Sequence, residues 1–439
     1  MIRWNWRTAL WVLLYVVVVV APLVGGVLNL AHGRGFWLNF SIALGFVSLS
    51  MFGAQLVMVS RLAFVAQPLG MDGVLRFHRQ MAYVATAFAL VHPVILFLLD
   101  AKYWPLLNVF TSPLRAKFAV AATVALIALM LMSIFRQRLG LKYTTWKLWH
   151  WLLALVVLGA SLAHAALVNY YLQDPTEQMI WLGLSALFVG VAVWMRLIHP
   201  LLRWRRRWRV VAVTPAEAGC TTLSLEPQHR GSRFRFEPGQ FAWIAARRSP
   251  FSLTDNPFSI SSSAEHPERI EFTIKSHQGF SAEVAQLQVG ETVTLDGPHG
   301  GFVLNAPEPD APLVFVGAGV GVTPLLSMLR TLADRQATPA CHLWLANRDA
   351  KAVIAGEAIE ALRPRLPKLQ IVHAISNGVG DQRGQRIDAN FIDRHWPADG
   401  DRASFYICGP DAFMDAVEAA LRLRGVPEQH IHSERFAMA

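Results

Sequence analysis

The sequence predicts a multidomain membrane protein with a six-helix transmembrane bundle, then an antiparallel β-barrel, then an α/β domain built on a parallel sheet. Six apolar segments precede residue 200, each near the length of about 20 residues that spans hydrocarbon. Short β-like runs separated by glycine, proline and serine follow, up to about residue 303. From Pro312 onward, apolar strands alternate with helical runs, which is typical of a parallel sheet.

The composition agrees with a membrane domain joined to soluble domains. Of the 439 residues, 54% are hydrophobic, and the mean hydropathy is +0.35. The net charge of +10 does not indicate nucleic-acid binding, because much of it lies at segment ends and in an arginine cluster at 203–209, as at a membrane surface. The cysteines Cys220, Cys341 and Cys408 form no CxxC or disulfide-rich pattern, which is typical of a reducing compartment.

The apolar segments are predicted to span a membrane at 9–30, 36–59, 77–99, 116–135, 146–170 and 178–199. The first could instead be a signal peptide, since Arg3 and Arg7 precede it. We interpret it as a spanning helix, because the run is too long for a usual signal core and no clear cleavage site closes it.

Basic residues are distributed unequally between the two sides of the predicted bundle. One side has Arg3, Arg7, Arg61, Arg76, Arg79, Arg136, Arg138, Lys142, Lys147 and the 203–209 cluster. The other side has only Arg34, Lys102, Arg115 and Lys117. The positive-inside rule therefore predicts that both termini and the soluble half are cytoplasmic.

Four histidines repeat one spacing in the third and fifth segments. His78 and His92 lie 14 residues apart, and so do His150 and His164. Fourteen residues make about 3.9 helical turns, so each pair falls on nearly one helix face, roughly 21 Å apart along the axis. Because two axial imidazoles commonly hold a haem iron, the pattern predicts two metal sites, an inner His78–His150 and an outer His92–His164. The alternative is isolated histidines that bond backbone or line a water cavity, but the equal spacing favours haem.

The soluble half contains four short motifs that are individually weak. Asn256-Pro257-Phe258-Ser259-Ile260-Ser261-Ser262 closes a barrel strand, and residues 274–281 precede a helix start. The glycines of 317–324 follow a strand and open a helix, where a pyrophosphate can approach the backbone. Cys408-Gly409-Pro410 ends a strand at the ligand-binding edge of such a sheet, although a buried structural thiol is the alternative for Cys408.

In this order, the motifs resemble those of the ferredoxin–NADP reductase superfamily. The flavin motif [RH]-P-[FY]-[ST] matches Pro257, Phe258 and Ser259, and Gly239-Gln240-Phe241 and Gly297-Pro298-His299-Gly300 match its flanking elements. With the six-helix segment in front, nearly the whole chain resembles the ferric reductase and NADPH oxidase superfamily in a compact bacterial form. The resemblance implies a haem-binding transmembrane domain (1–205), an FAD-binding β-barrel domain (206–305) and an α/β, NAD(P)H-binding domain (306–439).

The resemblance also implies a role for each candidate residue. Phe258 and Ser259, with Ser261 in the same motif, would contact the flavin. The FAD phosphates would lie at Lys275, Gly279 and Ser281, and the pyridine-nucleotide pyrophosphate at Gly317, Gly319, Gly321 and Thr323. Cys408 and Gly409 would lie near the nicotinamide. Phe436 would shield the flavin face, although it could equally be a strand-end core residue.

Two departures from the family pattern affect the nucleotide sites. Asn256 replaces the basic residue that usually opens the flavin motif, so one phosphate contact is lost or moved. Asn377 follows Ser376 where NADPH-specific relatives often have arginine. Arg348 could still bind a 2′-phosphate, whereas the adjacent Asp349 could accept from the ribose of NADH. We favour NADPH.

The resemblance implies FAD, two b-type haems and NAD(P)H as cofactors in a multi-pass protein of a bacterial inner membrane. Electrons would pass from the cytoplasm to a small external acceptor, with no nucleic acid and no obligate protein partner. We favour oxygen, which would give superoxide. A ferric chelate and a periplasmic protein remain open as acceptors, and so does a haem-free membrane anchor for a soluble flavin reductase.

Overall fold

The computed structural model describes residues 6–28, 35–60, 62–169, 175–204, 207–229, 234–246, 255–276, 280–305, 308, 310–377 and 384–435. It divides into two compact units, Met1–His199 and Pro200–Ala439. Each unit is considered by itself. The predicted site residues Gly279 and Phe436 lie outside the described residues.

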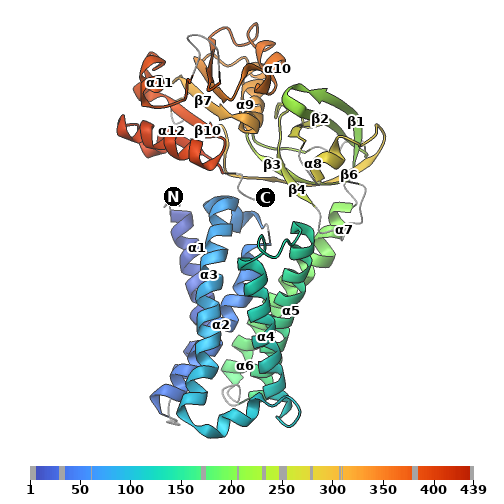
Figure 1. The fold of residues 1–439 in the computed structure, drawn as a ribbon, viewed down its shortest axis with the longest axis vertical. Coiled ribbons are helices and arrows are strands. Elements are labelled where there is room, and N and C mark those ends of the chain that lie inside the picture. The colour runs from blue at the N-terminus through green and yellow to red at the C-terminus, as the bar shows by residue number, and fades with distance from the viewer. Residues whose placement is uncertain are drawn as a thin grey trace. The chain divides into compact units, whose positions relative to one another are not determined.

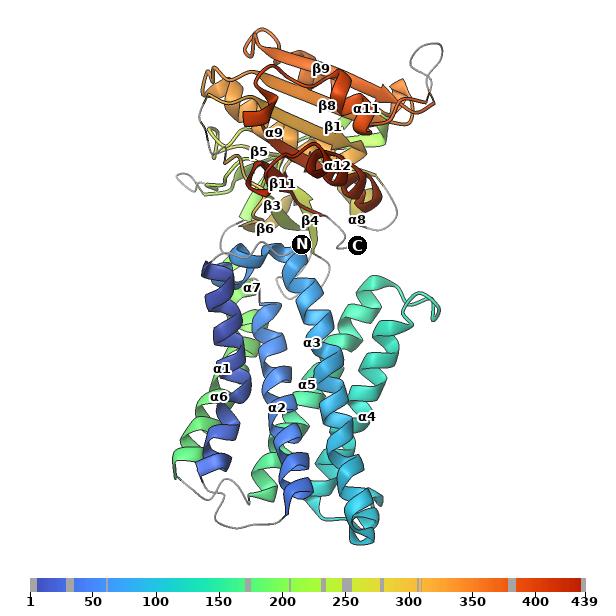
Figure 2. The same ribbon diagram turned by 90° about the vertical axis from the view of Figure 1, so that its left-hand side faces the viewer.

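The first unit is a bundle of long apolar helices (Figures 1 and 2). They are α1 (Trp6–Leu28), α2 (Phe36–Met58), α3 (Ala63–Leu99), α4 (Leu114–Ile134), α5 (Tyr143–Val168) and α6 (Pro175–Val193). In the described part of the chain, five helices are long and apolar enough to cross a membrane, and the apolar stretch of α1, Thr8–Leu23, is shorter. Many of their leucine and valine side chains are exposed, as expected for a surface that lipid covers.

Helix α3 begins well before the predicted segment and has an internal break. Its one residue with non-helical backbone angles is Gly70, with φ 67° and ψ 153°. The positive φ suits glycine, which has no Cβ to clash there. The apolar span itself runs from Gly73 to Leu99, so both predicted ligand histidines of this helix lie beyond the break.

The helices pack in pairs. Helix α2 lies along α3 and α4 lies along α5, whereas α3 and α5 make little direct backbone contact (Figure 2). Gly53 allows α2 to approach α6, because a Cβ at Gly53 would lie 2.1 Å from the buried ring of Phe188. A π-helical turn, Trp194–Ile198, and the short helix α7 (His199–Trp204) follow α6 along the chain.

The second unit begins with an antiparallel sheet of order β4-β3-β6-β1-β2-β5. Its strands are β1 (Arg207–Ala216), β2 (Cys220–Pro227), β3 (Phe241–Ala246), β4 (Asn256–Ser259), β5 (Ile270–Lys275) and β6 (Thr292–His299), with helix α8 (Phe280–Val284) before β6. The Ser261 N–H donates to Glu271 O at 2.8 Å, which joins the segment after β4 to β5. The curled sheet encloses an apolar core that includes Leu223, Phe272 and Ile274.

A parallel sheet of order β11-β10-β7-β8-β9 completes the unit. Its strands are β7 (Leu313–Ala318), β8 (Cys341–Asn347), β9 (Leu369–Ile375), β10 (Ser404–Cys408) and β11 (Ile431–Ser433). The helices are α9 (Val322–Asp334), α10 (Gly356–Glu360), α11 (Ala389–Arg394) and α12 (Asp411–Leu423). Separate apolar clusters contain residues of α9 and α10 and of α11 and α12, so both sheet faces are covered.

The predicted fold class is confirmed in all three parts: apolar helices, an antiparallel flavin-type sheet and a parallel α/β sheet. In the parallel sheet, β8 and β10 lie on opposite sides of β7, so the direction of strand addition changes there. Ligands bind at such switch points, beyond the carboxyl ends of the strands. The domain boundaries at 205/206 and 305/306 stay predictions.

Candidate functional site

His78 on α3 and His150 on α5 face each other across the helix bundle. Their ring centroids lie 6.4 Å apart, and their planes differ by 52°. Two imidazoles bound on opposite sides of one metal ion, through bonds of about 2 Å, put their ring centres roughly 6 Å apart. The spacing of this pair therefore fits one iron held between two axial nitrogens.

His92 on α3 and His164 on α5 are the second predicted pair. His92 Nδ1 lies 2.8 Å from the Ser41 carbonyl oxygen, and His164 Nδ1 lies 2.9 Å from the Arg115 carbonyl oxygen. A carbonyl oxygen can only accept, so each Nδ1 carries the hydrogen and donates it. Each Nε2 then keeps its lone pair, which is the form of histidine that binds a metal.

These pairs suit a haem better than a metal ion held by protein alone. Within the described ranges, no group of three or more His, Cys, Asp or Glu side chains is placed to hold a metal ion. A haem needs only two axial side chains, because its porphyrin supplies the other four nitrogens. The residues present therefore fit two haems, one at each histidine pair.

Sequence reasoning overlooked the residues of α2 that contact these histidines. Ser41 bonds His92, and the Gln55 amide lies beside His78. Ser41 and Gln55 are themselves 14 residues apart in an apolar helix. Since α2 runs antiparallel to α3, this polar spacing, equal to that of the histidines, was the signal that could have identified them.

The glycine loop and Cys408 come together at the switch point of the parallel sheet. Gly317 in β7 pairs with Cys408 in β10, and a Cβ at Gly321 would lie 2.3 Å from the Cys408 carbonyl oxygen. Gly319 has a φ of +55°. The Thr323 hydroxyl donates to Val320 O at 2.8 Å, so it braces the loop from within. The residues predicted to bind the pyrophosphate and the nicotinamide thus lie together at the ends of β7 and β10.

The segment after β11 enters the same site. A Cβ at Gly300, in the turn that closes the β-barrel, would lie 3.0 Å from Glu434 Oε2. Arg435 anchors this segment to α12 through Asp415 Oδ1 at 2.7 Å and Glu418 Oε1 at 3.4 Å. Glu434 is therefore a further candidate at the junction of the flavin barrel and the nucleotide domain.

The Cys408 thiol is fully buried. Burial, and secondarily the charge of Glu434, raises the pKa of Cys408 well above that of an ordinary cysteine. Burial also raises the pKa of Cys341 to about 12 and that of Cys220 above its usual value. The thiol of Cys408 is thus neutral at physiological pH and presents a compact apolar sulfur rather than a nucleophile.

The native protein is expected to resist thiol alkylation. Because a raised pKa lowers the thiolate fraction, iodoacetamide at pH 8 should modify Cys408 at least about tenfold more slowly than in the urea-unfolded chain. Mass spectrometry of the Cys408 peptide measures the two rates. Equal rates in folded and unfolded protein would contradict the buried, neutral thiol.

Arg348 directly follows strand β8, beside the loop that follows β9. Its carbonyl oxygen accepts from Asn377 N at 2.7 Å and from the Ser376 hydroxyl at 3.4 Å. The loops after β8 and β9 therefore lie together at the carboxyl edge of the sheet, with the exposed Arg348 side chain among them. The residues that the sequence suggested for the choice between NADPH and NADH, Arg348 and Asn377, therefore lie near each other.

The flavin motif residues divide into two environments. Phe258 and Ser259 are half-buried on the edge strand β4. Ser261 is completely buried, and its hydroxyl accepts from Thr273 Oγ1 at 3.1 Å inside the barrel. Lys275 ends β5 and Ser281 lies in α8. The cofactor role of Ser261 stays a prediction, and its hydroxyl is engaged within the barrel wall.

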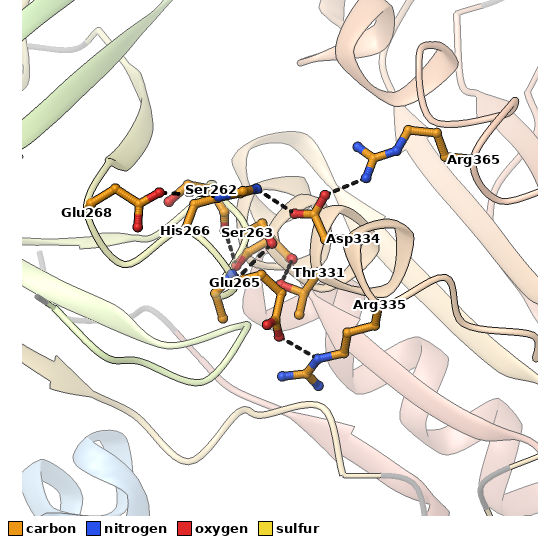
Figure 3. A network of polar contacts seen from close by, with 11 residues as sticks. Ser262, Ser263, Glu265, His266, Glu268, Thr331, Asp334, Arg335 and Arg365 are labelled. Atoms are coloured by element: carbon orange, nitrogen blue, oxygen red, sulfur yellow. Dashed lines mark hydrogen bonds and ion pairs between the residues drawn. The ribbon is translucent and has the colours of Figure 1, made fainter.

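Polar contacts join the segment after β4 to helix α9 (Figure 3). The Ser327 hydroxyl donates to Ser262 O at 2.7 Å, and Arg330 donates to Ser261 O at 2.8 Å. Farther out, His266 and Arg365 approach the Asp334 carboxylate from opposite sides (Figure 3). Because α9 begins at the glycine loop, these contacts fix the segment after β4 relative to that loop.

Three family models match the chain, and their order along the sequence is the same as that of the three structural parts. The family described as "Ferric reductase like transmembrane component" matches residues 44–161. The profile described as "FAD-binding domain" matches residues 204–301. The one described as "Oxidoreductase NAD-binding domain" matches residues 315–419.

Individual relatives resemble about half of the chain. Ferredoxin–NADP reductase B of Sorangium cellulosum is 32% identical over 242 residues, 52% of this chain and 96% of the relative. A flavohemoprotein of Bordetella pertussis is 30% identical, and the match spans 53% of this chain and 60% of that protein.

Among solved structures, the FAD/NAD-binding domain of a Vibrio cholerae nitric oxide dioxygenase aligns with a TM-score of 0.45 and 23% identity, over 53% of this chain and 98% of that one.

Proposed function

The chain belongs to the ferric reductase and NADPH oxidase superfamily, in which a membrane domain is joined to FAD-binding and NAD-binding domains, and from this we propose its function. It is a membrane oxidoreductase. In the proposed function, electrons pass from cytoplasmic NAD(P)H through FAD and two b-type haems to an acceptor outside. The observation that carries this proposal is the pair of facing histidine couples, His78–His150 and His92–His164.

The residues of the soluble unit would bind and orient the two nucleotides. The glycine loop and Gly409 would leave room for the backbone to approach a pyrophosphate, with Cys408 as the apolar neighbour of the nicotinamide. Phe258 and Ser259 would contact the flavin ring, and Lys275, Gly279 and Ser281 its phosphates. Bound FAD would convert a two-electron hydride donor into a source of single electrons, which haems can carry.

The charge asymmetry of the loops supports the direction of transfer. The basic residues gather at the N-terminus, around 61–79, around 136–147 and at 203–209. By the positive-inside rule, the His78–His150 pair is then the inner one and His92–His164 the outer one. The protein would lie in a bacterial inner membrane with its dehydrogenase domains in the cytoplasm.

We propose NADPH as the donor and oxygen as the acceptor, giving superoxide. Arg348 supports NADPH, because a guanidinium can pair with the 2′-phosphate that distinguishes it from NADH. Arg115 supports an anionic product or oxidant, since it is exposed and its own carbonyl holds His164. The same charge would also attract an anionic ferric chelate, which makes ferric-chelate reduction the second candidate.

NADPH-driven reduction in inside-out vesicles tests the proposal. With NADPH outside and the acceptor enclosed, we expect reduction of enclosed cytochrome c that enclosed superoxide dismutase suppresses by at least about tenfold. Reduction of an enclosed Fe(III) chelate in the absence of oxygen would instead favour the ferric reductase. Transfer to neither acceptor, with FAD still reduced by NADPH, would contradict the transmembrane route.

A visible spectrum separates the proposal from a haem-free anchor. We expect b-type haem bands in the purified protein, with about two haems for each FAD. FAD without haem would identify a membrane-anchored flavin reductase that serves a cytoplasmic partner. Haem that NADPH cannot reduce would indicate a binding or sensory cytochrome.

A further inference from the structure

The two histidine pairs differ in what holds their Nδ1 atoms. The Nδ1 atoms of His92 and His164 lie 2.8 and 2.9 Å from backbone carbonyl oxygens, and the Ser41 hydroxyl also lies 3.0 Å from His92 Nδ1. His150 Nδ1 instead lies 3.2 Å from the Ser133 hydroxyl, which itself accepts from Trp146 Nε1 at 3.4 Å. His78 Nδ1 lies beside the Gln55 side-chain amide. Each histidine of the His92–His164 pair therefore has a backbone carbonyl oxygen as a partner of its Nδ1, whereas the partners of the His78–His150 pair are side chains.

The Gln55 amide can meet His78 in two ways. With its nitrogen toward the ring, Gln55 donates to His78 Nδ1 at 2.5 Å and to His78 O at 3.3 Å, while its oxygen accepts from Ala82 N at 3.3 Å. This orientation satisfies the amide, but it requires that Nδ1 has no hydrogen. Rotating the amide by half a turn presents the oxygen, which accepts from a protonated Nδ1. Only the second arrangement leaves Nε2 of His78 free for iron.

We propose that Gln55 is a positioning residue that selects the tautomer of His78 and thereby sets the reduction potential of the haem at the His78–His150 pair. This inference rests on the proposed function, since it assumes a haem there. When Nδ1–H donates to an acceptor, the imidazole becomes a stronger ligand and stabilises ferric iron. At the other pair, carbonyl oxygens perform this role, and side-chain substitution cannot remove them.

Helix α2 supplies both kinds of partner from one face. Ser41 and Gln55 lie 14 residues apart and reach His92 and His78, which have the same spacing on the antiparallel helix α3. Midway between them, Ser48 is buried and donates only to Gly45 O of its own helix, at 2.9 Å. Ser48 thus provides a matched control: a buried polar residue of α2 that bonds no histidine.

Redox titration of the full-length protein tests the proposal. In wild type we expect two haem waves in the visible spectrum, which a His164→Ala variant assigns by removing the outer haem. Gln55→Leu should raise the midpoint potential of the inner wave, because the acceptor for Nδ1–H is lost. Gln55→Glu, which offers only acceptor oxygens, should lower it. The outer wave should not move in either variant, and Ser48→Ala should move neither wave.

The outcomes distinguish the role of Gln55 from the proposed function. If Gln55→Leu and Gln55→Glu leave the inner wave in place, or move both waves together, Gln55 has no such role and the proposed function stands. If Gln55→Leu does not fold, the shift in Gln55→Glu decides alone. A wild-type protein that binds FAD but no haem would overturn the proposed function and this inference with it.

Discussion

Replacing His92 or His164 with alanine is expected to abolish electron transfer to the external acceptor while NADPH still reduces FAD. Each substitution would remove one of the two histidines proposed to hold the outer haem, and a single imidazole holds iron far less tightly than two. We expect haem content to fall from about two to about one for each FAD. Transfer to the enclosed acceptor should fall by at least about 100-fold, because the second site lies roughly 21 Å along the helices from the first.

Three measurements check this result together: haem content, the rate of FAD reduction and the rate of acceptor reduction in vesicles. His199→Ala is the matched control, because His199 lies at the very end of the last predicted span and has no histidine at the matching spacing. It should keep both haems. If either ligand variant retained two haems and full transfer, the ligand assignment would be wrong.

Replacing Gly321 with alanine is expected to disable NADPH oxidation without loss of haem. The added Cβ would lie 2.3 Å from the Cys408 carbonyl oxygen and 2.8 Å from Gly409 N, and backbone atoms cannot move aside as a flexible side chain can. The glycine loop and the end of β10 would have to separate. A displacement of about 1 Å at a hydride-transfer site can cost roughly 100-fold in rate, and we expect at least that loss.

NADPH-dependent ferricyanide reduction measures this effect, because it reports on the soluble unit without requiring the haems. Gly425→Ala serves as the control. Gly425 has a φ of +89° with no neighbouring atom within 4 Å of the added Cβ, so alanine there should cost about 1 kcal/mol of strain and leave the rate unchanged. An unchanged rate in Gly321→Ala would show that the loop does not shape the nucleotide site.

Much of the architecture could be predicted from local patterns of apolar and basic residues in the sequence. Membrane-spanning helices can be predicted from sequence because lipid excludes unpaired backbone groups and most charged side chains. A long apolar run with basic flanks is therefore compatible with few structures other than a spanning helix. The parallel sheet could be predicted from its apolar strands, such as Leu313–Ala318 and Ser404–Cys408, because strands that are covered on both faces are apolar throughout. The break in α3 at Gly70 was not predicted, since a single glycine within a helical run is usually tolerated.

The candidate sites could be predicted only in part from the sequence. The spacing of the histidines follows from the helix period, which is local and can be counted. The partners of their Nδ1 atoms cannot be identified from spacing along the chain, because they lie on neighbouring helices: Ser41, Gln55, Arg115 and Ser133. Which residue faces which histidine depends on the pairing of α2 with α3 and of α4 with α5, and on the register of each pair.

The sequence by itself determined the three parts of this protein, the repeated histidine spacing and the order of the nucleotide motifs, because each is written in a short-range period or a contiguous motif. The tertiary structure alone decided that Gly321 abuts Cys408 and that the Ser261 hydroxyl lies inside the barrel. It also decided that backbone carbonyl oxygens meet both histidines of one pair, whereas side chains meet those of the other. These facts depend on contacts between segments far apart in the chain, and only packing brings such segments into register.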